Sequence, residues 1–291
     1  MSQQDQLYTT IINDLQKGKL VLPTLPEVAL KVREVANNPD VSAAQLAEVI
    51  TTDAALSTRL IKVANSPLYR GRVEVESVQT AVSRLGIPMV RNLVTSLVME
   101  QMFRPTNKKL EKRMRDLWQH SIEVAAASQV IASKQPNIAN DEAMLAGLIH
   151  EIGALPILMK AADTPELLED TRRLDTLIDN LYPKIGEAIL RSWDFPENLI
   201  TVAAEHANLN RNSQNGPDLT DVVQVANLQS YFNTSKALDP NTRDKVLAFR
   251  KLNIDTGISV VELDENSCSG TFPEYVKTEI CSRLFNKAIP G

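Results

Sequence analysis

The sequence predicts an all-α protein, and three observations lead to this class. Glycine is scarce, at 10 of 291 residues, while alanine, leucine and valine prevail among the apolar residues. Apolar positions recur every three or four residues, and alternating apolar and polar runs are nearly absent. The chain is long enough to bury a full core, and its hydrophobic (43%) and charged (23%) fractions are ordinary for a globular protein. One short run, ISVVEL at 258–263, also fits a strand.

Segment 140–160 is the one around which the rest of the chain is expected to pack. Its apolar residues follow the i, i+3, i+4, i+7 pattern of a helix, with Asn140 expected to cap it and Gly153 to end it. The opposite face carries small residues and His150 where a surface helix would carry charge, so burial on all sides is expected. His150 and Glu151 then need a hydrogen bond, a paired charge or a bound metal.

The first part of the chain, residues 10–104, is expected to form several short helices. Pro26 suits the first turn of one of them. Ser42, Asp53 and Ser77 each stand directly before an apolar periodic stretch, and their short polar side chains can accept a hydrogen bond from the first helical turn. These three residues are therefore predicted to be N-caps.

The second part is expected to continue as a series of helices, at residues 117–132, 140–152, 167–181, 182–193, 196–206 and 221–232. The helix at 117–132 places His120 on its apolar face, and the helix that Pro196 opens does the same for His206. Beyond residue 236 the chain becomes more polar, and two further helices are expected near 242–251 and 273–287.

The charge of the chain limits its partners. The net charge of −5 argues against a general binder of nucleic acid or of anionic membranes, because both need clustered positive charge. The one basic cluster, RPTNKKLEKRMR at 104–115, is interpreted first as a solvated helix linking two halves of the protein. A patch for an anionic ligand or a partner is the other interpretation, and a nucleic-acid binder would rest on this cluster alone.

The sequence has no pattern typical of a targeting signal, and its cysteines do not form a disulfide or zinc-binding pattern. The N-terminus lacks the basic and apolar regions of a signal peptide. No uninterrupted apolar segment approaches the length of about 18 residues that is needed to span a membrane. A cytoplasmic location is therefore expected. Cys268 and Cys281 are too few for a disulfide framework or a cysteine zinc site and are expected to be unpaired thiols.

The chain has only three histidines, and all three fall on inward-facing helical positions. A histidine on an apolar face is commonly a hydrogen-bonded core residue. Imidazole and carboxylate groups that converge from separate helices can instead hold a divalent cation, which could activate water against a phosphate ester. His120, His150, His206 and Glu151 are enough donors for one such metal and too few for two.

The order of several motifs resembles a known family. The stretches LPTLPEVALKV, ITTDAALSTRLIKVANSPLY, VQTAVSRLGIPMVRNLV, LWQHSIEVAAA, AGLIHEIGALPIL and IGEAILRSWDFPENLI together resemble the HDOD domain over roughly residues 15–232. That domain is an all-helical relative of the HD phosphohydrolases and the HD-GYP phosphodiesterases and is common in bacterial signal transduction.

The resemblance implies a domain organisation. An N-terminal helical extension is expected at 1–14 and an HDOD domain at 15–235. The domain would consist of an N-terminal helical half, 15–104, and an HD-like half, 105–235. A helical C-terminal tail, 236–291, would follow.

Active HD enzymes use an early histidine, an adjacent His-Asp pair and a later aspartate. In this sequence His120 corresponds to the early histidine and His150 to the first half of the pair, while Glu151 replaces the aspartate. Ala154 stands where the HD-GYP branch places a lysine. Glutamate keeps the charge but moves the carboxylate outward by one methylene, a change that a preorganised metal site tolerates poorly.

Three further residues are matched to positions of the family by their spacing in the sequence. Tyr182 stands where the active branch has another histidine, His206 keeps one of two neighbouring histidines, and Asn227 lies near the final aspartate. Tyrosine in place of histidine removes a nitrogen ligand, and asparagine in place of aspartate removes a negative charge. The resemblance therefore implies a vestigial metal site, with no catalytic residue and no bound metal expected.

The function that follows is a stand-alone, non-catalytic HDOD signalling module that binds a protein partner or a small ligand. A hydrogen-bonded network or small-ligand pocket is expected from six residues, His120, His150, Glu151, Tyr182, His206 and Asn227. The cluster 104–115 and the tail after Lys236 are candidate partner surfaces. The alternative is a metal-dependent phosphohydrolase or phosphodiesterase in which His120, His150, Glu151 and His206 hold a single divalent transition metal.

Overall fold

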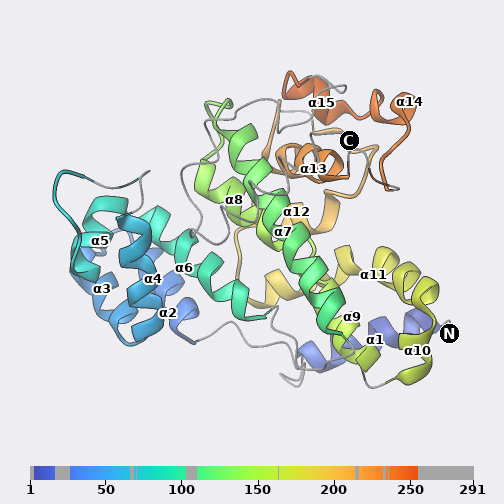
Figure 1. The fold of residues 1–291 in the computed structure, drawn as a ribbon, viewed down its shortest axis with the longest axis horizontal. Helices are drawn as coiled ribbons and strands as arrows, with labels where there is room; N and C mark the ends of the chain where they lie inside the picture. Colours follow the sequence, from blue (N-terminus) through green and yellow to red (C-terminus); the bar gives the residue numbers. More distant parts are fainter. Residues whose placement is uncertain are drawn as a thin grey trace, which may run out of the picture. The chain divides into compact units, whose positions relative to one another are not determined.

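A computed structural model describes residues 3–16, 27–65, 69, 71–102, 110–162, 164–213, 216–231, 234 and 236–254. Over these residues the regular secondary structure consists of helices, α1 to α15, with no strand, which confirms the all-α prediction (Figure 1). The strand considered at 258–263, the helix near 273–287, both cysteines and residues 104–109 of the basic cluster lie outside the described residues.

The chain divides into two compact units. Among the described helices, the first unit contains α1 (Gln3–Gln16) and the series from α7 to α15, and the second contains α2 to α5 and most of α6 (Ile87–Met102). The first unit is therefore discontinuous in sequence. Its α1 packs against α11 (Thr171–Ser192), with Ile11 fully buried, and Asp14 forms an ion pair of 2.7 Å with Lys160 of α9 (Ala154–Ala162).

The second unit is built from α2 (Glu27–Ala36), α3 (Ala43–Thr51), α4 (Ala54–Ala64), α5 (Val78–Leu85) and α6. The three predicted N-caps are confirmed. Ser42 forms a capping box with Gln45, Asp53 accepts a hydrogen bond from the Leu56 amide (2.9 Å), and Ser77 accepts one from the Thr80 amide (3.1 Å).

In the first unit, α7 (Glu111–Ala132) packs against α8 (Asn140–Ile149) and α13 (Leu219–Ser230), as Figure 1 shows. The contact between α7 and α8 is close because Gly147 has no side chain. A Cβ at Gly147 would lie 2.7 Å from the Cα of Ala125. Residues Ala143 to Ile149 are all buried, which confirms the predicted burial of this helix on all sides.

Within the described residues one helical stretch, Asn140–Ala162, has the length and composition to cross a membrane. In its most apolar window, 83% is buried inside the protein. The core helix of a soluble protein has the same features, because burial among other helices also favours an apolar surface on all sides. The predicted cytoplasmic location stays a prediction.

The limits of the central helix differ from those expected. Asn140 is the first helical residue rather than the cap, and the residue before it, Ala139, makes no side-chain capping bond. The helix ends at Ile149, before Gly153, because His150 Nδ1 bonds the Gly147 carbonyl oxygen (2.7 Å), the acceptor that a continuing helix would use for the next amide. A new helix, α9 (Ala154–Ala162), follows.

The prediction of two helices at 167–181 and 182–193 was wrong. A short helix, α10 (Pro165–Glu169), precedes one continuous helix, α11 (Thr171–Ser192), with Pro183 inside it. An interior proline costs a helix about 3 kcal/mol. The apolar face of α11 stays buried on both sides of the proline, from Leu174 to Ile189, and this packing outweighs the local cost.

The last described helices also differ in part from those predicted from the sequence. Helix α12 (Glu197–Glu205) follows Pro196 as expected, and α13 begins at Leu219, two residues earlier than expected, because Asp218 and Asp221 form a capping box. In place of one helix near 242–251 there are two short ones, α14 (Pro240–Arg243) and α15 (Leu247–Lys251).

We expect Gly153→Ala to destabilise the protein by about 1–3 kcal/mol, because an added methyl group would overlap the Tyr182 carbonyl oxygen and lie 2.5 Å from the Gly186 amide nitrogen. Gly186→Ala is the matched control. Its Cβ would lie 3.4 Å from the nearest atom, so its free energy of unfolding should change by less than about 1 kcal/mol. Urea denaturation measures both. Equal losses in the two variants would contradict the close approach at Gly153.

Candidate functional site

Five aromatic side chains form one continuous row in the first unit. Ring centroids are 5.6 Å apart between Tyr182 and His206, 4.9 Å between His206 and His150, 5.1 Å between His150 and His120, and 4.9 Å between His120 and Tyr231. The row joins α11, the end of α12, the end of α8, α7 and the end of α13. The structure thus brings together all three histidines.

Two of the histidines are held by the helices that end at them. His150 and His206 are the C-caps of α8 and α12 and are 0% and 1% exposed. Each Nδ1 faces a backbone carbonyl oxygen, that of Gly147 at 2.7 Å and that of Val202 at 2.8 Å. Carbonyl oxygens only accept, so both rings carry their proton on Nδ1 and present a lone pair at Nε2.

The lone pair of His206 already has a partner. The Tyr182 hydroxyl lies 3.1 Å from His206 Nε2 and donates to it. Gln224 of α13 adds a second attachment, because its Nε2 donates to the carbonyl oxygens of His206 (2.9 Å) and Asn208 (2.8 Å). His206 and Tyr182 therefore form a closed hydrogen-bonded pair at the inner end of the row.

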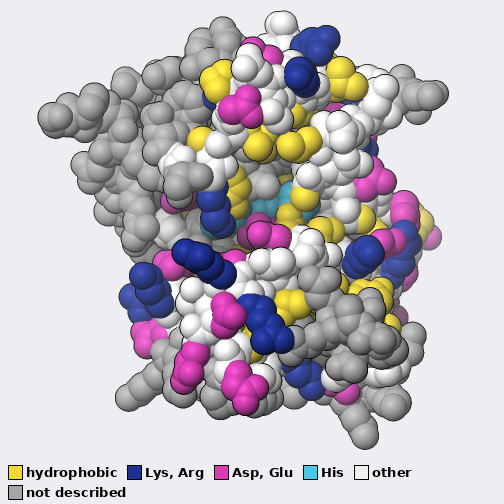
Figure 2. All heavy atoms as spheres, turned by 90° about the vertical axis from the view of Figure 1, so that its right-hand side faces the viewer, with side chains coloured by type: hydrophobic (Ala, Val, Ile, Leu, Met, Phe, Trp, Pro, Cys, Tyr) yellow, Lys and Arg dark blue, Asp and Glu magenta, His cyan; other side chains and the backbone are white. Residues whose placement is uncertain are grey.

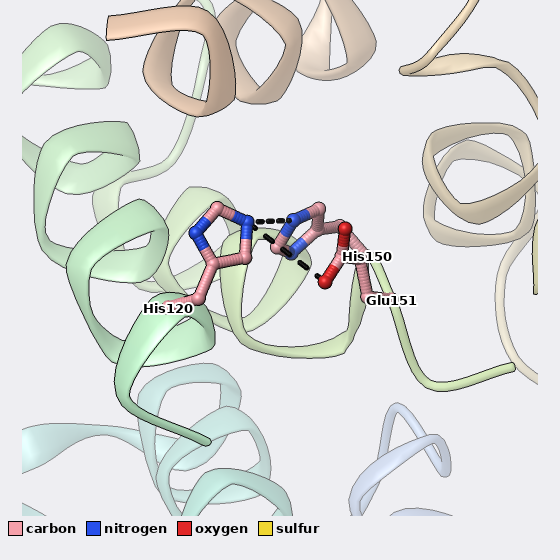
Figure 3. A group of neighbouring side chains, drawn as sticks. All are labelled: His120, His150 and Glu151. Atoms are coloured by element: carbon pink, nitrogen blue, oxygen red, sulfur yellow. Dashed lines mark hydrogen bonds and ion pairs between the residues drawn. The ribbon is translucent and has the colours of Figure 1, made fainter. Parts of the chain in front are cut away.

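His120, His150 and Glu151 form a separate group of possible metal ligands (Figure 3). His120 Nε2 lies 3.3 Å from His150 Nε2 and 3.8 Å from Glu151 Oε2, and the three ligand atoms lie within 4.8 Å of one another. Two imidazole nitrogens and one carboxylate suit a single zinc, iron or manganese ion. Among the described residues the set fits one metal and does not fit two.

Tyr231 was missed by the sequence reasoning. It is the C-cap of α13, its ring stacks on His120 at an interplanar angle of 15°, and its hydroxyl lies 3.2 Å from His120 Nε2. Ser230 lies beside it, 3.5 Å from His120 Nδ1. Residues four apart share a helical face, so the placement of Asn227 near the site was a signal that could have pointed to Tyr231.

Asn227 lies on α13 one helical turn before Tyr231 and is 8% exposed. Its Oδ1 atom is buried, and no described protein atom bonds it. A buried amide oxygen without a partner is costly, and such groups in native proteins commonly face a ligand or water. Asn227 is therefore a candidate for contact with a bound molecule.

Burial sets the protonation of the site. It is the main cause that holds the pKa of His150 well below its ordinary value, and His206 and His120 add to the effect. Burial also lowers the pKa of His206 to about 4. In the opposite direction, burial raises the pKa of Glu151 to about 7, although the positive charge of Lys236 opposes the rise. Burial likewise raises the pKa of Tyr231 above its ordinary value.

The site is open on one side. Figure 2 shows histidine side chains at the bottom of a hollow that has apolar and acidic side chains along its walls. Lys236 is exposed, and its Nζ atom lies 5.3 Å from the centre of the Tyr231 ring. A molecule or ion can therefore approach the row of rings from solvent.

A helical bundle whose core carries a histidine, a His-Glu pair and a later polar residue resembles the HD-like class of proteins. Residues 22–209 match the sequence model of the HDOD domain, and this match covers well over half of the chain. The chain belongs to the HDOD family, which confirms the resemblance read from its motifs.

Two relatives are similar to this chain over most of its length. A presumed metal-dependent phosphohydrolase of Shewanella amazonensis SB2B is 32% identical, with a TM-score of 0.72, and the match covers 96% of this chain and 100% of that one. An uncharacterized protein of Treponema pallidum (strain Nichols) is 25% identical over 227 residues. The match covers 72% of this chain and 42% of that protein, so the chain spans less than half the length of this curated relative.

Two further solved structures share the fold. An HDOD domain protein of unknown function from Geobacter sulfurreducens is 20% identical, with a TM-score of 0.67, and the match covers 97% of this chain and 99% of that one. A presumed signal transduction protein of Marinobacter aquaeolei VT8 is 19% identical, with a TM-score of 0.65, over 98% of this chain and 66% of that one.

The pKa shifts predict a pH dependence of stability with two opposing parts. His206 titrates at 6.5 when unfolded and at about 4 when folded, so the stability it contributes is present above pH 6.5 and is lost as the pH falls. Glu151 titrates at 4.5 when unfolded and at about 7 when folded, so its stability is present below pH 4.5 and is lost as the pH rises.

In the metal-free protein, Glu151→Gln removes the opposing part. Between pH 6.5 and 4.5 the variant should lose stability more steeply than the wild type, by up to about 1.4 kcal/mol per pH unit for one proton. Urea denaturation with a chelator present, at pH 6.5, 5.5 and 4.5, measures the difference. Parallel profiles would show that Glu151 does not hold a proton in the folded state.

Proposed function

We propose that this chain is a non-catalytic HDOD regulatory module that binds a small ligand or a protein partner, in keeping with a role in bacterial signal transduction. The observation that supports it is the hydrogen bond of 3.1 Å from the Tyr182 hydroxyl to His206 Nε2. That bond occupies the nitrogen that His206 would need to bind a metal together with His120, His150 and Glu151. Because Asn227 stands in place of an aspartate, the side chains that remain as possible metal ligands are those of His120, His150 and Glu151.

A pocket for a small ligand is the function of the hollow that best fits the polar groups that remain there. The unbonded Oδ1 of Asn227 is an acceptor, and the exposed Lys236 ammonium supplies a charged donor close to Tyr231. A small polar molecule could bond both kinds of group while its apolar part covers the walls that Figure 2 shows. Binding of such a molecule in the hollow would then change the surfaces that the protein presents to a partner.

Two surfaces remain candidates for a protein partner. In the described part of the basic cluster, Arg113 pairs with Asp175 at 2.6 Å and Arg115 with Glu111 at 2.5 Å, so this part behaves as a solvated helical surface. Residues 103–109 and 255–291 lie outside the described residues, so the partner surfaces proposed there rest on the sequence alone.

The binding proposal predicts that the protein does not turn over phosphoesters. With manganese, iron or magnesium added, the hydrolysis of a generic phosphate monoester and a generic phosphodiester by the wild type should equal that by His150→Ala. Thermal unfolding of the same samples checks that both proteins are folded. Metal-dependent turnover that His150→Ala abolishes would overturn the proposal.

A second candidate function is a mononuclear metal-dependent phosphohydrolase. It is favoured by the convergence of His120, His150 and Glu151 and by the similarity to the Shewanella protein. When bound, a divalent cation supplies Lewis acidity and lowers the pKa of water. The protein would contribute the orientation of the two imidazoles, which the bond from His150 to the Gly147 carbonyl fixes, and the charge of Glu151.

A further inference from the structure

His120 Nε2 has more neighbours than one proton can satisfy. It lies 3.2 Å from the Tyr231 hydroxyl oxygen, 3.3 Å from His150 Nε2 and 3.8 Å from Glu151 Oε2. His150 Nε2 presents a lone pair, because the proton of its ring is on Nδ1. If His120 Nε2 carries a proton, it can serve only one of these atoms well. If it carries a lone pair, two lone pairs face each other at 3.3 Å.

Two of these spacings match the edges of a coordination polyhedron. Two ligands bonded to one cation at about 2.0–2.1 Å lie about 2.9 Å apart at a right angle and about 3.4 Å apart at the tetrahedral angle. The distances from His120 Nε2 to Tyr231 (3.2 Å) and to His150 (3.3 Å) fall inside this range. The distance to Glu151, 3.8 Å, exceeds this range, and the ligand atoms of His120, His150 and Glu151 lie within 4.8 Å of one another, so the glutamate side chain would have to rotate toward the imidazoles when the metal binds.

We propose that the Tyr231 hydroxyl is a fourth donor of a mononuclear metal site formed with His120, His150 and Glu151. On binding, the hydroxyl releases its proton to solvent, so that Tyr231 and Glu151 together supply two negative charges that offset a dication. The metal ligand that takes the place of the later aspartate is thus Tyr231, the C-cap of α13. It is not Asn227, which lies one helical turn earlier.

The surroundings of Tyr231 hold it in this position. Its ring stacks on His120 with centroids 4.9 Å apart, and the Lys236 ammonium lies 5.3 Å from the centroid of the Tyr231 ring, within cation–π range. Tyr182 lies at the opposite end of the row of rings, and its hydroxyl donates to His206 instead. The chain therefore contains its own control, a second tyrosine in the same row of rings whose hydroxyl has a different partner.

Loading the full chain with ferric iron tests this assignment, because a phenolate bound to ferric iron gives a visible charge-transfer band that histidine and carboxylate ligands do not give. The wild type should show the band and about one iron per chain by elemental analysis. Tyr231→Phe should lose the band and bind iron at least about tenfold more weakly. Tyr182→Phe should keep the band.

Tyr231→His separates loss of a donor from loss of folding. It replaces the oxygen donor by a nitrogen, so it should bind iron more tightly than Tyr231→Phe and still lack the band. A wild-type protein that binds no iron, or that binds it without the band, overturns the proposal, as does a band that persists in Tyr231→Phe.

The inference rests on the metal site of the second candidate function and not on hydrolysis. A band without phosphoester turnover would support the role of Tyr231 and remove the phosphohydrolase. Absence of iron would overturn the role of Tyr231 and leave the ligand-binding module intact.

Discussion

The hydrogen bond of 2.7 Å from His150 Nδ1 to the Gly147 carbonyl oxygen is the interaction on which the rest of the site depends. It ends α8, fixes the tautomer of His150 and directs Nε2 toward His120. Gly147 also sets the packing of the two helices, because only a residue without a side chain allows α8 to approach Ala125 of α7 so closely. The separation of the two helices and the chemistry of the imidazole pair are therefore set by the same two residues.

The local part of the fold could be predicted from the sequence. The N-caps Ser42, Asp53 and Ser77 and the burial of α8 depend on neighbours in the chain, and each was identified correctly. The break expected near Tyr182 was wrong, because the buried face of α11 outweighs the local effect of Pro183. Such a balance depends on which other helices cover that face, and periodicity does not contain this information.

The candidate site shows the same limit. Inward-facing periodicity predicted the burial of His150 and His206, and the family resemblance identified Tyr182 as a replacement for a ligand. The hydrogen bond from Tyr182 to His206 could not be predicted, because it joins two helices 24 residues apart in sequence. Tyr231 was missed for a related reason. It lies outside the motifs, and only the packing of α13 on α7 brings its ring against His120.

The discontinuity of the first unit has a consequence for how the protein can be divided. The family match, 22–209, excludes both α1 and α13. A fragment cut to those limits would uncover the face of α11 on which Ile11 packs, and it would lack the helix that carries Asn227 and Tyr231. The sequence limits of the family and the physical limits of its folded unit thus differ in this chain. A piece that keeps both the cover of α11 and the complete row of rings has to begin with α1 and extend past α13.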